Sequence, residues 1–293
     1  MTQTAEILTT WCIGVYVLAA LIYALMWLKD AKILRWSAPA VLACGLGLNL
    51  FQLFSRWLET NQPPFKTLFE SLVLFAACVT ILYLAVEFIY RARILGSFSG
   101  LMAAAILLYG LLGHDKEAVN LPPALQSGWF IPHVVVYFFG YGAMVIAFII
   151  AIVFLVQGAQ SAQSVAQKQA TKMESASVFQ LRFAHLLPLE LRNMEWLLDL
   201  TVRFGFALLT FGLLIGAVWA KEAWGDYWTW DPKETWSLVT WLVFAAYLHL
   251  HYLSGWRGKK LAFLVIAGFA AVLFTYLGMH LLPNADQSAH VYQ

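Results

Sequence analysis

Long apolar segments alternate with short polar ones along the whole chain. Eight segments consist almost entirely of apolar residues, and most are about 18 residues long or longer, which suits helices that cross a hydrocarbon core about 30 Å thick. The pattern therefore predicts an all-α integral membrane protein with about eight transmembrane helices. The predicted spans are Ile7–Leu28, Trp36–Phe54, Leu68–Val86, Ile94–Gly113, Trp129–Val156, Phe204–Trp219, Trp236–Leu253 and Leu261–Leu282.

The composition agrees with a membrane protein. Of the 293 residues, 61% are hydrophobic and 12% are charged, whereas soluble domains are about 45–50% apolar. We therefore expect a single membrane domain over residues 1–293, with four helices in 7–113 and a functional core in 128–282. The first span lacks a basic start and a cleavage site, so we expect a retained helix and not a signal peptide. The net charge of +2 is too small to indicate a nucleic-acid partner.

The positive charges divide unequally between the two sides of the predicted bundle. Successive connections lie on alternate sides, and one side holds 13 of the 18 Lys and Arg residues against five on the other. The positive-inside rule makes the first side cytoplasmic, so both termini are expected on the outer side. The 13 are Lys29, Lys32, Arg35, Arg91, Arg93, Lys168, Lys172, Arg182, Arg192, Arg203, Arg257, Lys259 and Lys260, and the five are Arg56, Lys66, Lys116, Lys221 and Lys233.

Residues 157–195 form the longest connection on the predicted cytoplasmic side. They are rich in Gln, Ala and Ser and become mildly amphipathic around Val178–Leu191. We expect a cytoplasmic connector with an interfacial helix.

Residues 219–236, which we call the tryptophan loop, connect the sixth and seventh spans on the outer side. Counting on to Trp241, six of the 13 tryptophans fall within 23 residues. A membrane-interface belt also places Trp at helix ends, but it is normally sparse and spread over many helices. Rings crowded into one loop favour a surface that stacks on one large, flat, apolar ligand. The candidate binding residues are Trp224, Tyr227, Trp228 and Trp230.

Part of this loop has a purely structural explanation. The order Asp231-Pro232-Lys233-Glu234 matches a helix N-cap, a proline in the first turn and a reciprocating glutamate. Asp231 and Glu234 are therefore expected to cap the seventh span first. Thr67 and Glu70 match the same pattern at the third span. Lys221 and Lys233 remain as cations for a carboxylate, although a solvated surface lysine is the alternative.

Two histidines far apart in the sequence are predicted to meet at the tryptophan loop. His133 opens the fifth span and His280 nearly closes the eighth, and both ends are outer by the charge distribution. A histidine near a helix end is usually a satisfied interfacial residue. Two imidazoles beside an aromatic platform, however, suit the two axial positions of a haem iron.

A third histidine lies deep in the seventh span. His249 is 13 residues from its start, so it lies about 20 Å from the outer end, in the cytoplasmic third of the bilayer. An ionisable side chain there is a functional candidate that needs a partner, and simple satisfaction by a hydroxyl or carbonyl is the alternative. His251 points about 200° round the helix, so it cannot share a ligand with His249. His114, His185 and His290 receive no role.

The segment Trp224–Trp236, WGDYWTWDPKETW, resembles the WWD signature of the cytochrome c assembly superfamily. The histidines at 133, 280 and 249, the last within Tyr247-Leu248-His249-Leu250, resemble the CcsA branch, also called ResC, of the system II pathway. Pro64-Phe65-Lys66-Thr67-Leu68-Phe69-Glu70-Ser71 is similar to that branch before its third span.

This resemblance implies a holocytochrome c synthase (haem lyase) subunit that acts with a CcsB/ResB partner in a bacterial plasma membrane or a thylakoid membrane. Haem b is its substrate and passes from an inner site at His249 to the outer WWD site, where His133 and His280 bind the iron. Trp224, Tyr227, Trp228, Trp230 and Asp231 belong to that outer site. There the thiols of an apocytochrome c CxxCH motif add to the haem vinyl groups.

Two other functions compete with this interpretation. A dihaem electron-transfer cytochrome b needs four ligands, but the inner leaflet offers only His249 or His251. A haem exporter or regulator of the same superfamily would need the same platform and ligands as a lyase. Because no Ser/His/Asp set, P-loop or zinc motif is present, hydrolysis and ATP-driven transport have no support, and no catalytic residue is assigned.

Overall fold

A computed structural model describes residues 2–29, 31–113, 123–170 and 191–278. Every regular element in these ranges is helical, which confirms the predicted all-α fold. The α-helices are α1 (Thr2–Leu28), α2 (Lys32–Thr60), α3 (Leu68–Tyr90), α4 (Gly96–Gly113), α5 (Phe130–Ala170), α7 (Leu191–Trp224), α8 (Pro232–Tyr252) and α9 (Lys259–Leu277), with short 3₁₀ turns at Arg93–Leu95 and Pro123–Gln126.

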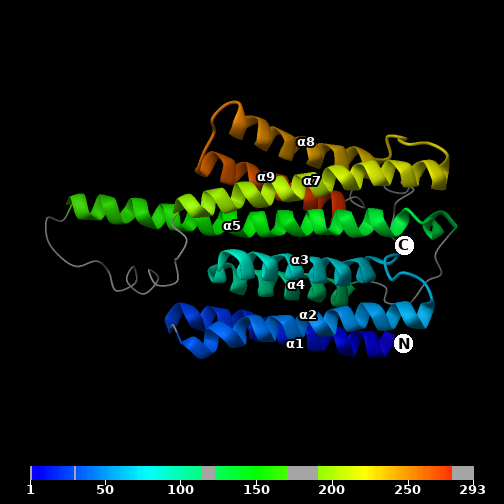
Figure 1. Cartoon of the computed structure of the whole chain (residues 1–293), viewed down its shortest axis with the longest axis horizontal. Helices are drawn as coiled ribbons and strands as arrows, with labels where there is room; N and C mark the ends of the chain where they lie inside the picture. Colours follow the sequence, from blue (N-terminus) through cyan, green and yellow to red (C-terminus); the bar gives the residue numbers. More distant parts are fainter. Residues whose placement is uncertain (1, 30, 114–122, 171–190, 279–293) are drawn as a thin grey trace.

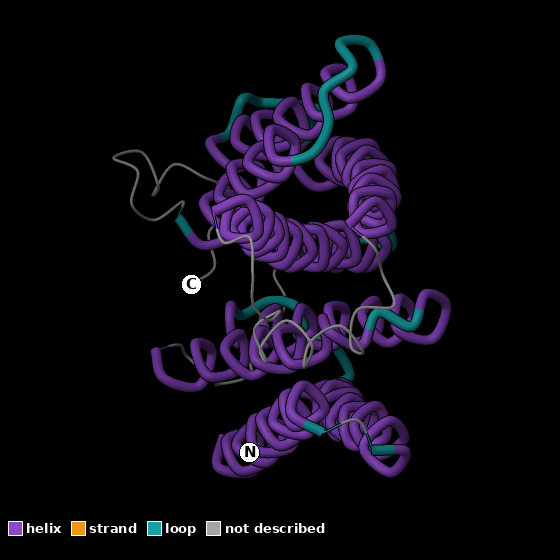
Figure 2. Tube along the Cα trace, turned by 90° about the vertical axis from the view of Figure 1, so that its left-hand side faces the viewer, coloured by secondary structure: helices purple, strands orange, loops and turns teal. Residues whose placement is uncertain are grey.

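The helices run alternately up and down in three layers (Figure 1). Viewed end on, α1 and α2 form one layer, α3 and α4 the next, and α5, α7, α8 and α9 the third (Figure 2). The start of α1 therefore lies at the same end of the bundle as the α7–α8 connection. The described N- and C-terminal helix ends share this end, because eight antiparallel helices return the chain to its starting side.

Seven of the described helices are long and apolar enough to cross a membrane, and α8 is the exception. The polar Thr, Ser and His residues of α8 lower its mean hydropathy. It nevertheless runs antiparallel to α7 and α9 across the bundle (Figure 1). The prediction of about eight membrane helices is confirmed, with α8 the least apolar of them.

Most helices are longer than the predicted spans, and α5 and α7 exceed them the most. α5 continues past Val156 to Ala170, and α7 begins at Leu191 instead of Phe204. The first part of the expected 157–195 connector therefore prolongs α5, and its last residues belong to α7. The amphipathic segment expected around Val178–Leu191 lies outside the described residues, apart from Leu191 itself.

Candidate functional site

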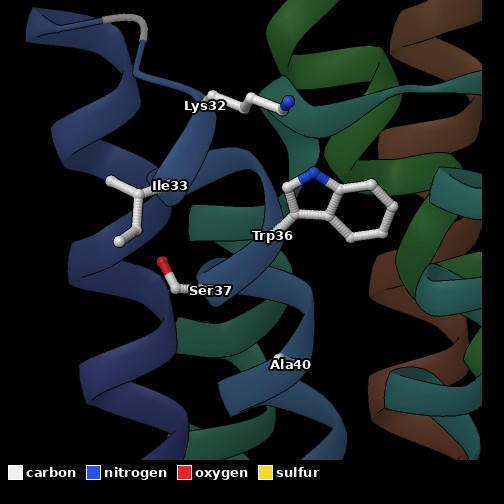
Figure 3. Close-up of a pocket in the computed structure, with 5 residues that line it drawn as sticks. All are labelled: Lys32, Ile33, Trp36, Ser37 and Ala40. Carbon is white, nitrogen blue, oxygen red and sulfur yellow. The ribbon is translucent and has the colours of Figure 1, made fainter.

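One open hollow on the surface lies far from the predicted site. It is an open cavity of about 700 Å³ at the start of α2, lined by Lys32, Ile33, Trp36, Ser37 and Ala40 (Figure 3). All five residues come from one helix. The cavity holds none of the predicted ligand residues, and it lies at the end of the bundle opposite the tryptophan loop (Figure 1).

The start of α8 holds the tryptophan loop in place. α7 ends at Trp224, Gly225 follows with φ +93°, and α8 begins at Pro232. Asp231 and Glu234 form the predicted capping box. The Glu234 carboxylate accepts the backbone N–H of Thr229 at 2.8 Å and that of Asp231 at 3.2 Å. Because one buried carboxylate holds two loop amides, the cap also fixes the conformation of the loop.

The aromatic rings of the loop differ in exposure and direction. Tyr227 is 59% exposed and Trp230 is 66% exposed, whereas Trp224 and Trp228 are half-buried. The Trp228 and Trp230 rings are 5.8 Å apart and almost perpendicular, at 87°. In this arrangement one of the two can stack on the face of a flat ligand while the other contacts its edge.

Trp230 has an unfavourable backbone conformation. Its φ of +60° lies in the left-handed region, which costs a bulky residue about 1–3 kcal/mol and is found mostly at functional sites. Trp230 is flanked by Thr229 and Asp231, whose amides Glu234 holds. These bonds keep the exposed indole in one direction at the surface.

Lys221 also binds within the loop. Its Nζ donates to the Gly225 carbonyl and lies 5.6 Å from the centre of the Tyr227 ring. The ammonium group therefore lies beside an exposed aromatic ring of the predicted platform, where it can meet an anionic ligand.

His133 lies in the first turn of α5 and packs against the base of the tryptophan loop. Its ring stacks on buried Trp219, with centroids 5.5 Å apart and planes 22° apart. Trp219 in turn contacts Trp224 at 4.7 Å. The structure thus brings His133 together with the tryptophan loop, as the topology predicted.

Two glycines of α7 make room for α5 at this point. A Cβ added to Gly216 would lie 2.6 Å from Cε1 of His133, and Gly212 lies against Tyr137 in the same way. Neither these glycines nor the stacking of Trp219 was predicted from the sequence. The GxxxG spacing from Gly212 to Gly216 is the signal that could have indicated the close α5–α7 packing.

A backbone hydrogen bond orients the His133 imidazole. Its Nδ1 lies 2.9 Å from the Gly212 carbonyl oxygen. A carbonyl only accepts, so Nδ1 must carry the proton, and in the neutral ring the lone pair is then on Nε2. This is the tautomer that binds a metal through Nε2.

His280 lies outside the described residues. The described part of α9 ends nearby, where Tyr276 packs on Phe138 of α5 at 5.4 Å and on Phe75 of α3 at 5.7 Å. The Tyr276 hydroxyl also pairs with Ser71 at 2.7 Å. These contacts hold the last turn of α9 against α5. The contact residue Phe138 follows His133 by five positions in the sequence of α5.

His249 and His251 occupy the last turn of α8, at the opposite end from the tryptophan loop. The side chain of His249 is exposed, whereas that of His251 is buried. Both ring nitrogens of His251 face other groups: Nδ1 lies 2.6 Å from Arg257 and Nε2 lies 3.3 Å from Asp199. The two imidazoles do not share a ligand face, as the helical periodicity predicted.

Sequence comparisons agree with this geometry. The family model described as cytochrome C assembly protein matches residues 65–285, a range that contains the whole tryptophan loop. The cytochrome c biogenesis protein CcsA of Microcystis aeruginosa is 38% identical over 269 residues, covering 80% of this chain and 82% of the relative. This chain belongs to the CcsA family. The corresponding protein of Gloeobacter violaceus is 35% identical, and the match covers 90% of this chain and 90% of the relative. That of Chlorella vulgaris is also 35% identical, and the match covers 82% of this chain and 81% of the relative. The resemblance at the tryptophan loop is confirmed, and this CcsA-family chain serves cytochrome c biogenesis.

One solved structure shares the fold. It is a cytochrome c heme lyase CcmF, 17% identical, with a TM-score of 0.62. The match covers 94% of this chain and 46% of that structure, so the chain spans about half the length of CcmF. At this identity the likeness shows the helix arrangement alone.

Proposed function

We propose that this CcsA-family protein attaches haem covalently to apocytochrome c at the outer end of the bundle, with haem b as its substrate. The observation that carries the proposal is a chain of ring contacts: His133 stacks on Trp219, and Trp219 meets Trp224 edge-on. These contacts join the proposed iron ligand to an exposed aromatic loop at one end of the molecule.

The residues at this end suit a haem. Nε2 of His133 is the proposed iron-binding nitrogen, because Nδ1 faces the Gly212 carbonyl. The exposed Trp230 ring can contact the face of the macrocycle, and its perpendicular neighbour Trp228 can contact the edge. The Trp228 indole N–H is buried and has no acceptor among the described residues. A propionate oxygen would satisfy it, since buried donors are almost always paired.

His280 is the proposed second axial ligand. The described chain leaves α9 at Leu277, and three residues span at most about 10 Å. The Tyr276–Phe138 contact holds this point against α5. The two imidazoles would keep oxygen from the iron while the haem waits for the apocytochrome.

The attachment itself is an addition that needs no oxidant. Each CxxCH thiol adds across one vinyl group, the sulfur forming the C–S bond on one carbon while the thiol proton goes to the other. Haem and cysteines supply this chemistry, and the protein contributes binding and orientation. A rigid loop that holds the macrocycle at one angle brings both vinyl groups within reach of the two thiols.

A second haem site is proposed at the inner end, shared with a CcsB/ResB-like partner. His249 lies on an exposed stripe of α8 that otherwise consists of Leu242, Ala246 and Leu253. An imidazole that faces lipid alone is unfavourable, so a partner helix is the expected cover of this stripe.

The proposed orientation follows from the charges. The described end that carries the tryptophan loop has few basic residues, and Lys29, Arg93, Arg257 and Lys260 lie toward the other end. The positive-inside rule then puts the loop and both termini on the periplasmic or lumenal side of a bacterial plasma membrane or thylakoid membrane.

We expect the purified complex of this chain with its partner to convert apocytochrome c to a product that keeps its haem in denaturing gels. An apocytochrome with both CxxCH cysteines replaced by serine is the control, since it leaves haem binding to the complex unchanged. If haem crosses the membrane and reaches an outer acceptor but no thioether forms, the chain is an exporter and the lyase proposal is wrong.

Trp230→Ala should lower the haem content of the purified protein at least about fivefold, because an exposed stacking surface of about 1–3 kcal/mol is lost. Trp228→Ala and Trp224→Ala should act in the same direction, with near-normal yield of protein. Trp11→Ala is the matched control, because Trp11 is equally exposed at 66% but lies on α1. Normal haem in whatever protein remains, with reduced yield, would favour the interfacial belt.

A further inference from the structure

A buried polar cluster lies where α7 begins and α8 ends. Asp199 of α7 is 6% exposed and accepts from the Tyr252 hydroxyl at 2.8 Å and from Arg203 Nε at 3.0 Å. Nε2 of His251 lies 3.3 Å from its other carboxylate oxygen. One carboxylate on α7 thus meets two consecutive side chains in the last turn of α8.

Both ring nitrogens of His251 lie close to polar groups of other segments. Nδ1 lies 2.6 Å from NH1 of Arg257 and 3.2 Å from the Trp256 carbonyl oxygen, while Nε2 lies 3.3 Å from Asp199. His251 therefore connects α7 to the α8–α9 connection, and an alternative role as an iron ligand would require one of these contacts to break.

The same cluster closes the end of α8. Arg257 also donates to the His251 carbonyl at 2.7 Å, and the Trp256 N–H donates to the Leu250 carbonyl at 2.9 Å. The Gly258 N–H donates to Glu195 of α7 at 2.6 Å. The last carbonyls of a helix have no partner within the helix, and such ends fray unless other groups satisfy them. Here groups of the cluster satisfy them.

His249 depends on this helix end. Its carbonyl accepts the Leu253 N–H at 2.9 Å, the last bond of the α8 ladder. Its ring is exposed, and no hydrogen bond, ion pair or ring contact joins it to another described side chain. The backbone of the last turn therefore sets the direction of the ring. The cluster anchors this backbone at His251, two residues after His249.

We propose that Asp199 and His251 are positioning residues for His249. They fix the last turn of α8 against α7 so that the exposed imidazole meets a partner-bound haem at one angle. This inference rests on the proposed inner haem site, and it adds the residues that preorganise that site.

Hydrogen–deuterium exchange of the whole chain in detergent tests the anchoring without haem. In His251→Leu, the amides of residues 248–253 should exchange about tenfold faster, because a buried contact to a charged group is lost. Asp199→Asn should also speed the exchange of these amides, and it serves as the test if His251→Leu folds poorly. Thr240→Val is the matched control, since it removes the buried Thr240–Thr275 bond of 2.8 Å from mid-helix and should leave residues 248–253 unchanged. Unchanged exchange in both cluster variants would overturn the anchoring.

The haem spectrum of the complex with the partner tests the positioning. His251→Leu should lower the inner haem content about threefold or shift its low-spin spectrum, and His251→Gln, which offers an acceptor to Arg257 and a donor to Asp199, should restore it. Loss of the inner haem in His249→Ala with a normal spectrum in His251→Leu would overturn the positioning role alone. Retention of this haem in His249→Ala would instead overturn the inner-site proposal.

Discussion

Substitution of His133 by glycine should lower the outer haem content of the purified protein at least about tenfold, because losing even a group that orients a metal ligand costs about 10–100-fold in metal affinity. The ring stacks on Trp219 and presents Nε2 through its bond to the Gly212 carbonyl. Glycine has no side chain, so nothing in the variant replaces that nitrogen. The measurement is the haem absorption spectrum per mole of protein, together with cytochrome c maturation.

Added imidazole should restore both readouts in His133→Gly, since a small ligand can enter the space left by the ring and bind the iron. His280→Gly should behave in the same way. His290→Gly is the control, a histidine of the same predicted side without a proposed role. Unchanged spectra and normal maturation in both His133→Gly and His280→Gly would show that the axial assignment is wrong.

Co-expression of this chain with a CcsB/ResB-like partner should add a second haem that is absent when the chain is expressed alone. His249 is exposed on an apolar face of α8, and the only other described histidine at this end, His251, has both nitrogens engaged. We therefore expect the second imidazole to come from another polypeptide. Haem per chain, measured by the pyridine haemochrome assay, should rise from about one to about two, as two bis-imidazole sites require.

His249→Ala should remove the second haem from the complex and leave the outer one in place. Leu242→Ala is the matched control, because Leu242 lies on the same exposed stripe and is 51% exposed but binds no metal. A full haem complement in the isolated chain would contradict a shared site and indicate a self-contained carrier.

The local features of this protein could be read from the sequence. The spans follow from the length of apolar segments, and both capping boxes, at Thr67–Glu70 and Asp231–Glu234, follow from residues three positions apart. These interactions form within one helical turn, so their residues are neighbours in any fold that contains the helix. The same holds for the opposite directions of His249 and His251.

The environments of the described histidines were decided by the tertiary structure alone. His133 lies 79 residues from Gly212, whose carbonyl orients it, and 86 from Trp219, on which it stacks (219 − 133 = 86). His251 is buried beside Asp199 and Arg257. His249, two residues earlier in the sequence, is the one predicted to bind haem, and its side chain is exposed. Periodicity gives the direction of a side chain around its own helix, whereas burial depends on which helix packs against that face. In a membrane protein this choice is made by close packing at small residues such as Gly216, because lipid leaves no hydrophobic difference between one apolar face and another.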